Sequence, residues 1–131
     1  MTRVRDILQK KDARVVFIGP SLTLRQALET IVENKVGALP VKDERGDIVG
    51  IITERDLMRA VYERQDLDAH LVQEHMTASI VAARKDDGID SVMEQMTENR
   101  FRHVPILENH KLVGIISVSY THLTLPTTPY V

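Results

Sequence analysis

The chain has 131 residues, of which 43% are hydrophobic and 27% are charged, and its formal net charge is −2. This length fits one domain or two small subdomains that share a core, and the near-neutral charge argues against a nucleic-acid-binding protein, which needs a basic face. The chain contains no cysteine, so disulfides, thiolate metal sites and cysteine nucleophiles are excluded, as is common in a reducing compartment.

The amino-terminal residues Met1–Asp6 are charged and lack the apolar stretch of a signal peptide. No apolar run in the sequence approaches the roughly 20 residues that a membrane helix needs. We therefore expect a cytoplasmic protein without a membrane segment. Residues 4–8 share a pattern with residues 72–76, and each of these lead-in segments precedes the predicted first strand of a unit.

Residues 15–64 predict a unit of strand, helix, strand, strand and helix. The first strand is the β-branched and aromatic run Val15–Ile18, which a Gly-Pro pair ends. Capping-box spacing between Thr23 and Gln26 begins the first helix, whose apolar side chains recur on one face. The predicted elements lie at residues 15–18, about 24–34, 38–41, 48–52 and about 54–64.

A second unit follows in the same order. Asn34–Val41 returns as Asn99–Ile106, and Gly50–Thr53 returns as Gly114–Ser117. The two prolines are 65 positions apart and the two strand glycines 64, so the copies slip by one residue, inside the loop between the paired strands. A repeat of this size usually needs its twin to bury its apolar face. Its elements are predicted at residues 80–83, about 89–96, 103–107 and 112–117.

The two copies differ at their ends. Where the first copy continues into helix-forming residues 54–58, the second continues into Val118–Pro129, which is β-branched and broken by two prolines. We therefore divide the chain into a first repeat with its lead-in (1–68), a second repeat without its final helix (69–117) and an atypical tail (118–131). The tail is either a natural disordered terminus or a non-native frameshift or cloning scar.

The first candidate site is the junction Thr53–Asp56, where a strand meets a helix. Unpaired backbone N–H groups and the helix dipole favour an anion at such a junction. Thr53 and Asp56 also have capping-box spacing, so helix capping explains both residues without a ligand. Arg55 favours an anion nearby, because a cation in the first turn opposes the dipole. That anion could be Glu54, Asp56 or a ligand phosphate.

The two proline-containing segments form the second candidate region. Gly37-Ala38, just before Pro40, offers exposed backbone against which a flat ligand could lie. A helix C-cap glycine that leads into a strand explains the same pattern without a ligand. In the second copy Arg102 and His103 would supply hydrogen-bond donors to a phosphate if the copies face each other. A structural histidine is the plain alternative for His103.

Together these segments resemble a tandem cystathionine-β-synthase-type (CBS) domain pair, also called a Bateman module, over about residues 2–117. The family motif is Gly-apolar-apolar-Thr/Ser-x-x-Asp, and Gly50, Thr53 and Asp56 match it in full. The resemblance implies an α+β fold in which two β-α-β-β-α repeats pack sheet to sheet with pseudo-twofold symmetry. It also implies that the aspartate binds the ribose hydroxyls of an adenosyl ligand in a cleft between the repeats.

The second copy matches this motif in part, because Gly114 and Ser117 are present but Tyr120 stands where the family has its aspartate. One cleft is therefore better supported than the other. By the resemblance, the small residues of the first copy would bracket the base, while the arginines and the histidine would approach phosphates. The ligand-binding residues so implied are Gly37, Ala38, Pro40, Thr53, Arg55, Asp56, Arg102, His103, Pro105 and Ser117.

The expected function is therefore a regulatory or sensor module that acts on a partner protein. The resemblance implies AMP, ADP or ATP as ligand ahead of NAD or S-adenosylmethionine, with no required cofactor, and a homodimer as the assembly. A ligand-free dimerisation or scaffold module, in which the motif residues only cap helices, is the alternative.

An enzyme is not expected. The sequence has no P-loop, no GxGxxG, no HExxH and no GxSxG motif. His70 and His75 are five positions apart, which is not the i, i+4 spacing of two metal ligands on one helix face, so no metal site is expected.

Overall fold

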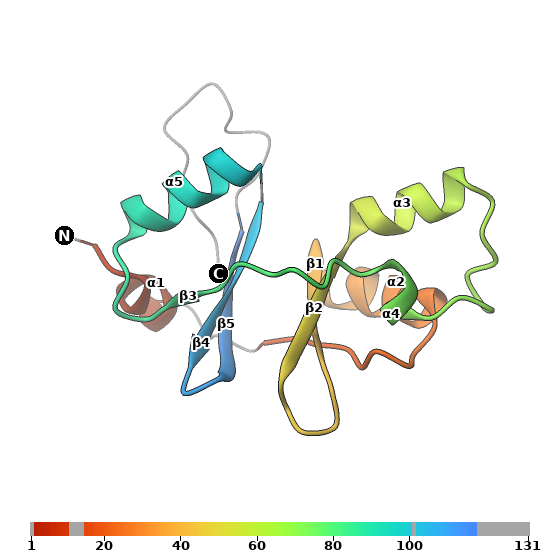
Figure 1. Ribbon diagram of the computed structural model, residues 1–131, viewed down its shortest axis with the longest axis horizontal. Helices are drawn as coiled ribbons and strands as arrows, with labels where there is room; N and C mark the ends of the chain where they lie inside the picture. Colours follow the sequence, from red (N-terminus) through yellow and green to blue (C-terminus); the bar gives the residue numbers. More distant parts are fainter. Residues whose placement is uncertain (1, 11–14, 101, 118–131) are drawn as a thin grey trace. The chain divides into compact units, whose positions relative to one another are not determined.

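The computed structural model describes residues 2–10, 15–100 and 102–117, and the chain forms two compact units (Figure 1). We call residues 16–80 the central unit, and the residues up to 15 together with those from 81 onward the split unit. Each unit contains one small sheet and its own helices, so the predicted α+β class is confirmed.

The central unit contains an antiparallel hairpin and three helices. Helices α2 and α3 lie on the same side of the hairpin (Figure 1). The predicted first strand is reduced to one residue, since only Ile18 pairs, through a parallel bridge to Val41. The elements are α2 (Leu24–Asn34), β1 (Ala38–Lys42), β2 (Ile48–Thr53), α3 (Glu54–Tyr62) and α4 (Val72–His75).

The split unit contains a three-stranded sheet in the order β3-β4-β5, with β3 parallel and β5 antiparallel to β4. Helices α1 and α5 lie on the same side of this sheet (Figure 1). The strand predicted at 80–83 is instead a two-residue strand, displaced toward Arg84. The elements are α1 (Val4–Lys10), β3 (Ala83–Arg84), α5 (Ile89–Asn99), β4 (His103–Glu108) and β5 (Lys111–Ser117).

The two hairpins have the same register, as the duplication predicts. Pro40 pairs with Ile51 in one hairpin, and Pro105 pairs with Ile115 in the other. Both hairpins carry an irregularity between the first and second residues after the proline, at Val41 and Lys42 in β1 and at the corresponding place in β4. The one-residue slip between the copies therefore lies in the turns, which are free to differ in length without moving the strands.

The two turns show how the slip is accommodated. In the longer turn the Asp43 carboxylate accepts hydrogen bonds from the backbone N–H groups of Arg45 and Asp47, and Gly46 has a φ of 86°. In the shorter turn Asn109 and His110 have φ values of 51° and 67°, the left-handed pair typical of a two-residue hairpin. One loop residue is thus gained or lost without disturbing either sheet.

Each unit has its own hydrophobic core beneath its sheet. The central core joins α2 to the hairpin through fully buried side chains such as Leu24, Leu39 and Ile52. The core of the split unit joins α1 and α5 to the sheet through residues such as Val92 and Ile116. Burying a side chain of this size stabilises a fold by roughly 1.5–3 kcal/mol, so these contacts hold each sheet against its helices.

Each of the two lead-in segments packs on a strand glycine. In both cases the glycine belongs to the other repeat, not to the repeat that the lead-in was expected to precede. A Cβ built on Gly50 would lie 2.6 Å from Met76 Sδ and 2.8 Å from the Thr77 carbonyl oxygen. A Cβ built on Gly114 would lie 2.5 Å from a Leu8 methyl carbon. The first lead-in thus covers the second hairpin, and the second lead-in covers the first. Glycine in both motifs is required by this close approach.

The packing units therefore differ from a division in chain order. Backbone hydrogen bonds from Val4 to Asp87 and from Arg5 to Lys85 tie α1 to the split unit. The division at 1–68 and 69–117 stays a prediction about the repeats, as does their packing sheet to sheet with pseudo-twofold symmetry. The atypical tail 118–131, and with it the missing final helix, lies outside the described residues.

The glycine contacts give a stability prediction. Gly50→Ala should lower the free energy of unfolding by about 1–3 kcal/mol, because the added methyl group meets a backbone carbonyl that cannot move aside easily. Gly114→Ala should cost less, since only the end of the Leu8 side chain must shift. Gly19→Ala is the matched control, because nothing lies within 4 Å of its built Cβ. Urea unfolding measures all three, and equal stabilities for Gly50→Ala and Gly19→Ala would contradict the assignment.

Candidate functional site

The candidate residues of the central unit meet where β2 passes into α3. Thr53 is the last residue of β2 and the N-cap of α3, and it pairs in register with Ala38, the first residue of β1. The Glu54 N–H donates a hydrogen bond of 3.0 Å to the Gly37 carbonyl. The structure therefore brings Gly37, Ala38, Thr53 and the first turn of α3 together at one end of the hairpin.

The Asp56 carboxylate completes a capping box at this junction. Its Oδ2 atom accepts hydrogen bonds from Thr53 N–H at 2.9 Å and from Thr53 Oγ1 at 3.1 Å, and the Asp56 N–H donates back to Thr53 Oγ1 at 3.3 Å. Its Oδ1 atom lies 3.5 Å from Arg59 Nη1. The capping role expected from the spacing is therefore confirmed, and Arg59 is a neighbour that the sequence did not identify.

The capping contacts leave Asp56 able to bind a further donor. Its side chain is 11% exposed, and Oδ1, which lies 3.5 Å from Arg59 Nη1, has a lone pair for a further donor, whereas Oδ2 already accepts two hydrogen bonds from Thr53. A carboxylate held in a fixed orientation can accept hydrogen bonds from a pair of adjacent hydroxyl groups. Arg55, which precedes Asp56 in the first turn of α3, is exposed. The arrangement suits a polyhydroxylated ligand with an anionic group.

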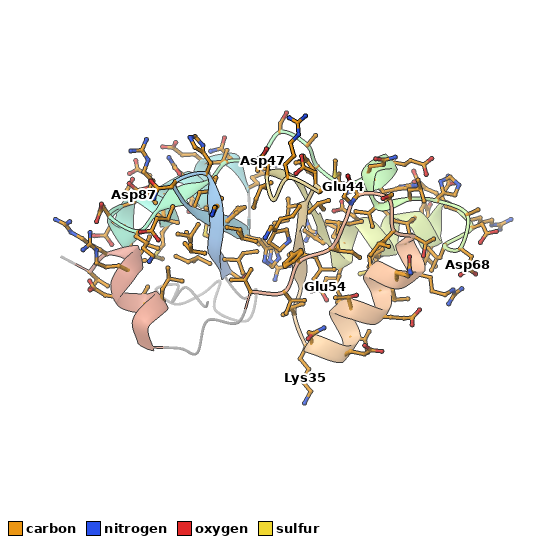
Figure 2. The ribbon with its side chains drawn as sticks, turned by 90° about the horizontal axis from the view of Figure 1, so that it is seen from below. Lys35, Glu44, Asp47, Glu54, Asp68 and Asp87 are labelled. Atoms are coloured by element: carbon orange, nitrogen blue, oxygen red, sulfur yellow. The ribbon has the colours of Figure 1, made fainter. Side chains whose placement is uncertain are left out.

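The chain passes from α2 to this junction through a residue in the left-handed backbone conformation. Helix α2 ends at Lys35, which has a φ of 54° and closes the helix in the left-handed conformation. The Lys35 side chain points away from the rest of the central unit (Figure 2). Gly37 then enters β1, and Pro40 is fully buried further along the strand. Pro40 therefore shapes the packing of the hairpin, whereas Gly37 and Ala38 border the junction.

The candidate residues of the split unit meet at the corresponding end of its hairpin. His103 and Ser117 pair in register, as Ala38 and Thr53 do in the central unit, and His103 Nδ1 lies 2.7 Å from Ser117 Oγ. Arg102 precedes His103, and Pro105 is fully buried in β4. The structure thus joins Arg102, His103 and Ser117 at one place and assigns Pro105 to packing.

Burial changes the charge expected of His103. Desolvation, together with the positive charge of Arg102, lowers the pKa of His103 from 6.5 to about 4. The ring is therefore neutral at neutral pH, and it can offer a ligand a hydrogen bond but no positive charge. As the hydrogen-bond donor to a phosphate that the sequence predicted, His103 would therefore act as a neutral ring.

A further pair of side chains comes together although their spacing did not suggest it. His70 Nδ1 lies 3.2 Å from His75 Nε2, with the ring centroids 5.1 Å apart. His70 lies before the first residue of α4 and His75 is its last residue, so the two side chains do not come from one face of a helix. In the described ranges, no group of three or more His, Cys, Asp or Glu side chains is arranged to hold a metal ion.

Comparison with known proteins decides the family. The CBS domain family model matches residues 4–63 and 72–120. The chain belongs to the CBS domain family. The two matched segments correspond to the two copies identified from the sequence, and they cover most of the chain.

Solved structures of CBS domain proteins are closely similar. A CBS-domain containing protein from Agrobacterium tumefaciens, ATU1752, is 41% identical, with a TM-score of 0.83 over 88% of this chain and 87% of that one. The CBS domain protein PAE2072 from Pyrobaculum aerophilum, solved in complex with AMP, is 26% identical, with a TM-score of 0.81 over 88% and 87%. The CBS domain pair of MJ0100, solved with 5′-methylthioadenosine and S-adenosyl-L-methionine, is 27% identical, with a TM-score of 0.78 over 89% and 90%.

Several curated relatives are longer than this chain. The chain spans 68% of an uncharacterized 17.7 kDa protein of Acidianus ambivalens, which is 34% identical over 113 residues, or 86% of the chain. It spans 22% of the L-aspartate semialdehyde sulfurtransferase of Methanocaldococcus jannaschii, which is 27% identical over 118 residues, or 89% of the chain.

Among the described helices, none has the length and apolar character needed to cross a membrane.

The lowered pKa of His103 gives a pH prediction. Between pH 6.5 and about 4 the unfolded chain binds a proton at this residue that the folded chain does not, so acidification through this range reduces stability. His103→Gln should remove roughly 2–3 kcal/mol of the stability lost between pH 7.5 and 4.5, as measured by urea unfolding. An identical loss of stability in the wild-type protein and the variant would contradict a neutral, buried ring.

Proposed function

We propose that this protein is a regulatory or sensor module that binds an adenine nucleotide or another adenosyl ligand in a cleft between its two CBS repeats. The observation that carries the proposal is the junction of β2 and α3, where a nearly buried carboxylate is held in place close to the partly exposed Gly37. The family membership and the AMP complex of PAE2072 support the ligand class.

The residues at the junction suit the parts of such a ligand. Asp56 would accept hydrogen bonds from the two ribose hydroxyls, since its orientation is fixed by Thr53 and Arg59. Gly37 and Ala38 would border the base, because a residue without a long side chain lets a flat ring approach the backbone. Arg55 would bind a phosphate group through its guanidinium.

The residues of the split unit suit a smaller set of roles. Arg102 would add charge to the phosphate side of a ligand. His103 would donate or accept a hydrogen bond to the ligand as a neutral ring. Ser117 would orient this ring, because its Oγ atom lies 2.7 Å from His103 Nδ1. Because no aspartate follows Ser117 at the motif position, we propose that the cleft based on Asp56 is the principal binding site. AMP, ADP and ATP are the proposed ligands, ahead of NAD and S-adenosylmethionine.

The direct test of the ligand site is Asp56→Ala. Its affinity for AMP, measured by calorimetry, should fall roughly 10- to 100-fold, which corresponds to losing about 1.5–3 kcal/mol of hydrogen bonding to a charged group. The substitution also removes a capping box, so Gln26→Ala is the matched control, because it breaks the similar box that Thr23 and Gln26 form at α2. Equal AMP affinity in the wild-type protein and Asp56→Ala would refute the site.

A ligand-free dimerisation or scaffold module is the second candidate function. It is favoured by one observation, namely that both oxygens of Asp56 already have partners within the protein. Thermal shift with a panel of AMP, ADP, ATP, NAD and S-adenosylmethionine separates the two functions. A ligand that binds only the folded state raises the melting temperature, whereas a scaffold shows no shift with any compound.

We also propose that the protein forms a homodimer through the outer face of α3. Met58, Val61 and Tyr62 are 69%, 59% and 86% exposed, and they share one face of this helix by their i, i+3 and i+4 spacing. Exposed apolar side chains that gather on one helix face are typical of an interaction surface.

The dimer is tested by adding a charge to this face. Met58→Glu should shift the protein toward the monomer in sedimentation equilibrium, because a carboxylate would have to be buried in the interface. Val32→Glu is the matched control, since it adds the same charge at a residue of α2 that is 66% exposed. A wild-type monomer, or a dimer that Met58→Glu leaves intact, would contradict this surface.

We propose a binding role rather than catalysis, with a cytoplasmic location and a partner protein that responds to the bound ligand. The absence of recognised catalytic motifs in the sequence and the CBS family membership support a regulatory role.

A further inference from the structure

The contact between Arg59 and Asp56 is the one contact of the Asp56 carboxylate that does not belong to the capping box. Arg59 Nη1 lies 3.5 Å from Asp56 Oδ1, whereas hydrogen bonds between a charged nitrogen and a charged oxygen are about 2.7–2.9 Å long. The Arg59 side chain is 59% exposed, so water can solvate its guanidinium when it moves away. An exposed ion pair within one helix adds little to stability, so this contact can be exchanged for another.

The Asp56 carboxylate keeps its place without Arg59. Its Oδ2 atom accepts hydrogen bonds from Thr53 N–H and Thr53 Oγ1, and the Asp56 N–H donates back to Thr53 Oγ1. Asp56 also lies in the first turn of α3, where the positive end of the helix dipole favours a carboxylate. Release of Arg59 therefore leaves the carboxylate oriented and its negative charge stabilised.

The lone pairs of the carboxylate limit which ligands it can accept. A carboxylate offers about four positions for hydrogen-bond donors, two at each oxygen. Thr53 fills both positions at Oδ2, and Arg59 lies at one of the two positions at Oδ1. A single hydroxyl group can bind at the remaining position beside Arg59. The second of two adjacent hydroxyl groups needs the position that Arg59 holds.

We propose that Arg59 is a specificity-determining residue of the ligand site, which leaves Asp56 when a ligand with two adjacent hydroxyl groups binds and stays when the ligand has only one. This role rests on the proposed function, because it requires an adenosyl ligand at Asp56. It identifies the ligand feature that the site distinguishes, the intact pair of ribose hydroxyls. Arg59 reduces the affinity gained from the second hydroxyl, since that hydroxyl must replace it.

A released Arg59 has a second carboxylate within reach on the same helix. Glu63, the C-cap of α3, lies four residues further along and is exposed. Side chains that are four residues apart are neighbours on a helix surface, and opposite charges at this spacing attract each other. Arg59 can therefore exchange one carboxylate for another, so its release should change ligand affinity by a few-fold rather than by orders of magnitude.

The test combines one side-chain substitution with the removal of one hydroxyl group. Calorimetry measures the affinities of AMP, 2′-deoxy-AMP and 3′-deoxy-AMP for the wild-type protein and for Arg59→Met, which has a side chain of similar length and no donor. We expect the ratio of AMP affinity to deoxy-AMP affinity to be roughly two- to fivefold larger in Arg59→Met. Any phosphate contact common to the three ligands, or a general change in charge, cancels in this ratio.

Arg25→Met is the matched control. It removes the same charge and breaks another exposed ion pair of the central unit, the one between Arg25 of α2 and Asp68. Its ratio of AMP affinity to deoxy-AMP affinity should equal the wild-type ratio. Arg59→Lys keeps a cation beside Asp56 and should restore most of the wild-type ratio, which a purely structural role of the arginine would not require.

Two results would overturn the role of Arg59, and they are distinguishable. If AMP binds and Asp56→Ala weakens it, but Arg59→Met leaves the ratio unchanged or lowers it, the ligand site stands and Arg59 has no part in selecting the ligand. If the wild-type protein binds none of the three nucleotides, the proposed function fails and the role of Arg59 fails with it.

Discussion

At the end of β2 the chain must change from strand to helix while the first N–H groups of α3 find acceptors. Thr53 and Asp56 satisfy two of these groups by reciprocal hydrogen bonds, and the Gly37 carbonyl accepts a third from Glu54. These bonds hold the carboxylate, the start of β1 and the first turn of α3 in a single arrangement. The proposed ligand site consists of the same groups, so capping the helix and orienting the ribose acceptor depend on one set of contacts.

The strand glycines of the motif are also explained by contacts within each unit. Gly50 and Gly114 hold the motif position in each copy, and in each unit a lead-in segment lies directly over the glycine. The residue type is therefore explained by packing before any ligand is considered. Because Leu8 covers Gly114 and Met76 covers Gly50, each core includes a segment that is distant in the sequence. Such contacts couple the two halves of the chain during folding.

Much of the fold followed from local pattern. The helix over residues 24–34 and both hairpins were predicted from capping spacing and apolar periodicity, and the structure confirms them. The strand predicted at 15–18 was wrong for residues 15–17, since only Ile18 pairs with another strand. The grouping of the first lead-in with the second hairpin was missed, since a non-local contact leaves no periodic signal.

The site was predictable to a similar degree. The capping box was visible in the spacing of Thr53 and Asp56, whereas the pairing of Asp56 with Arg59 depends on rotamers. The neutral state of His103 depends on desolvation, which the sequence does not reveal. The approach of His70 to His75 depends on the loop that precedes α4, so helical spacing alone does not reveal it.

The central claim is that one adenosyl ligand binds at the junction of β1, β2 and α3. The most direct measurement is an amide NMR titration of the ¹⁵N-labelled protein with AMP. The account predicts that the largest shifts fall on Gly37, Ala38 and residues 53–56, with a common saturation curve. Saturating AMP that leaves these amides unmoved, or that moves only residues remote from them, would contradict it.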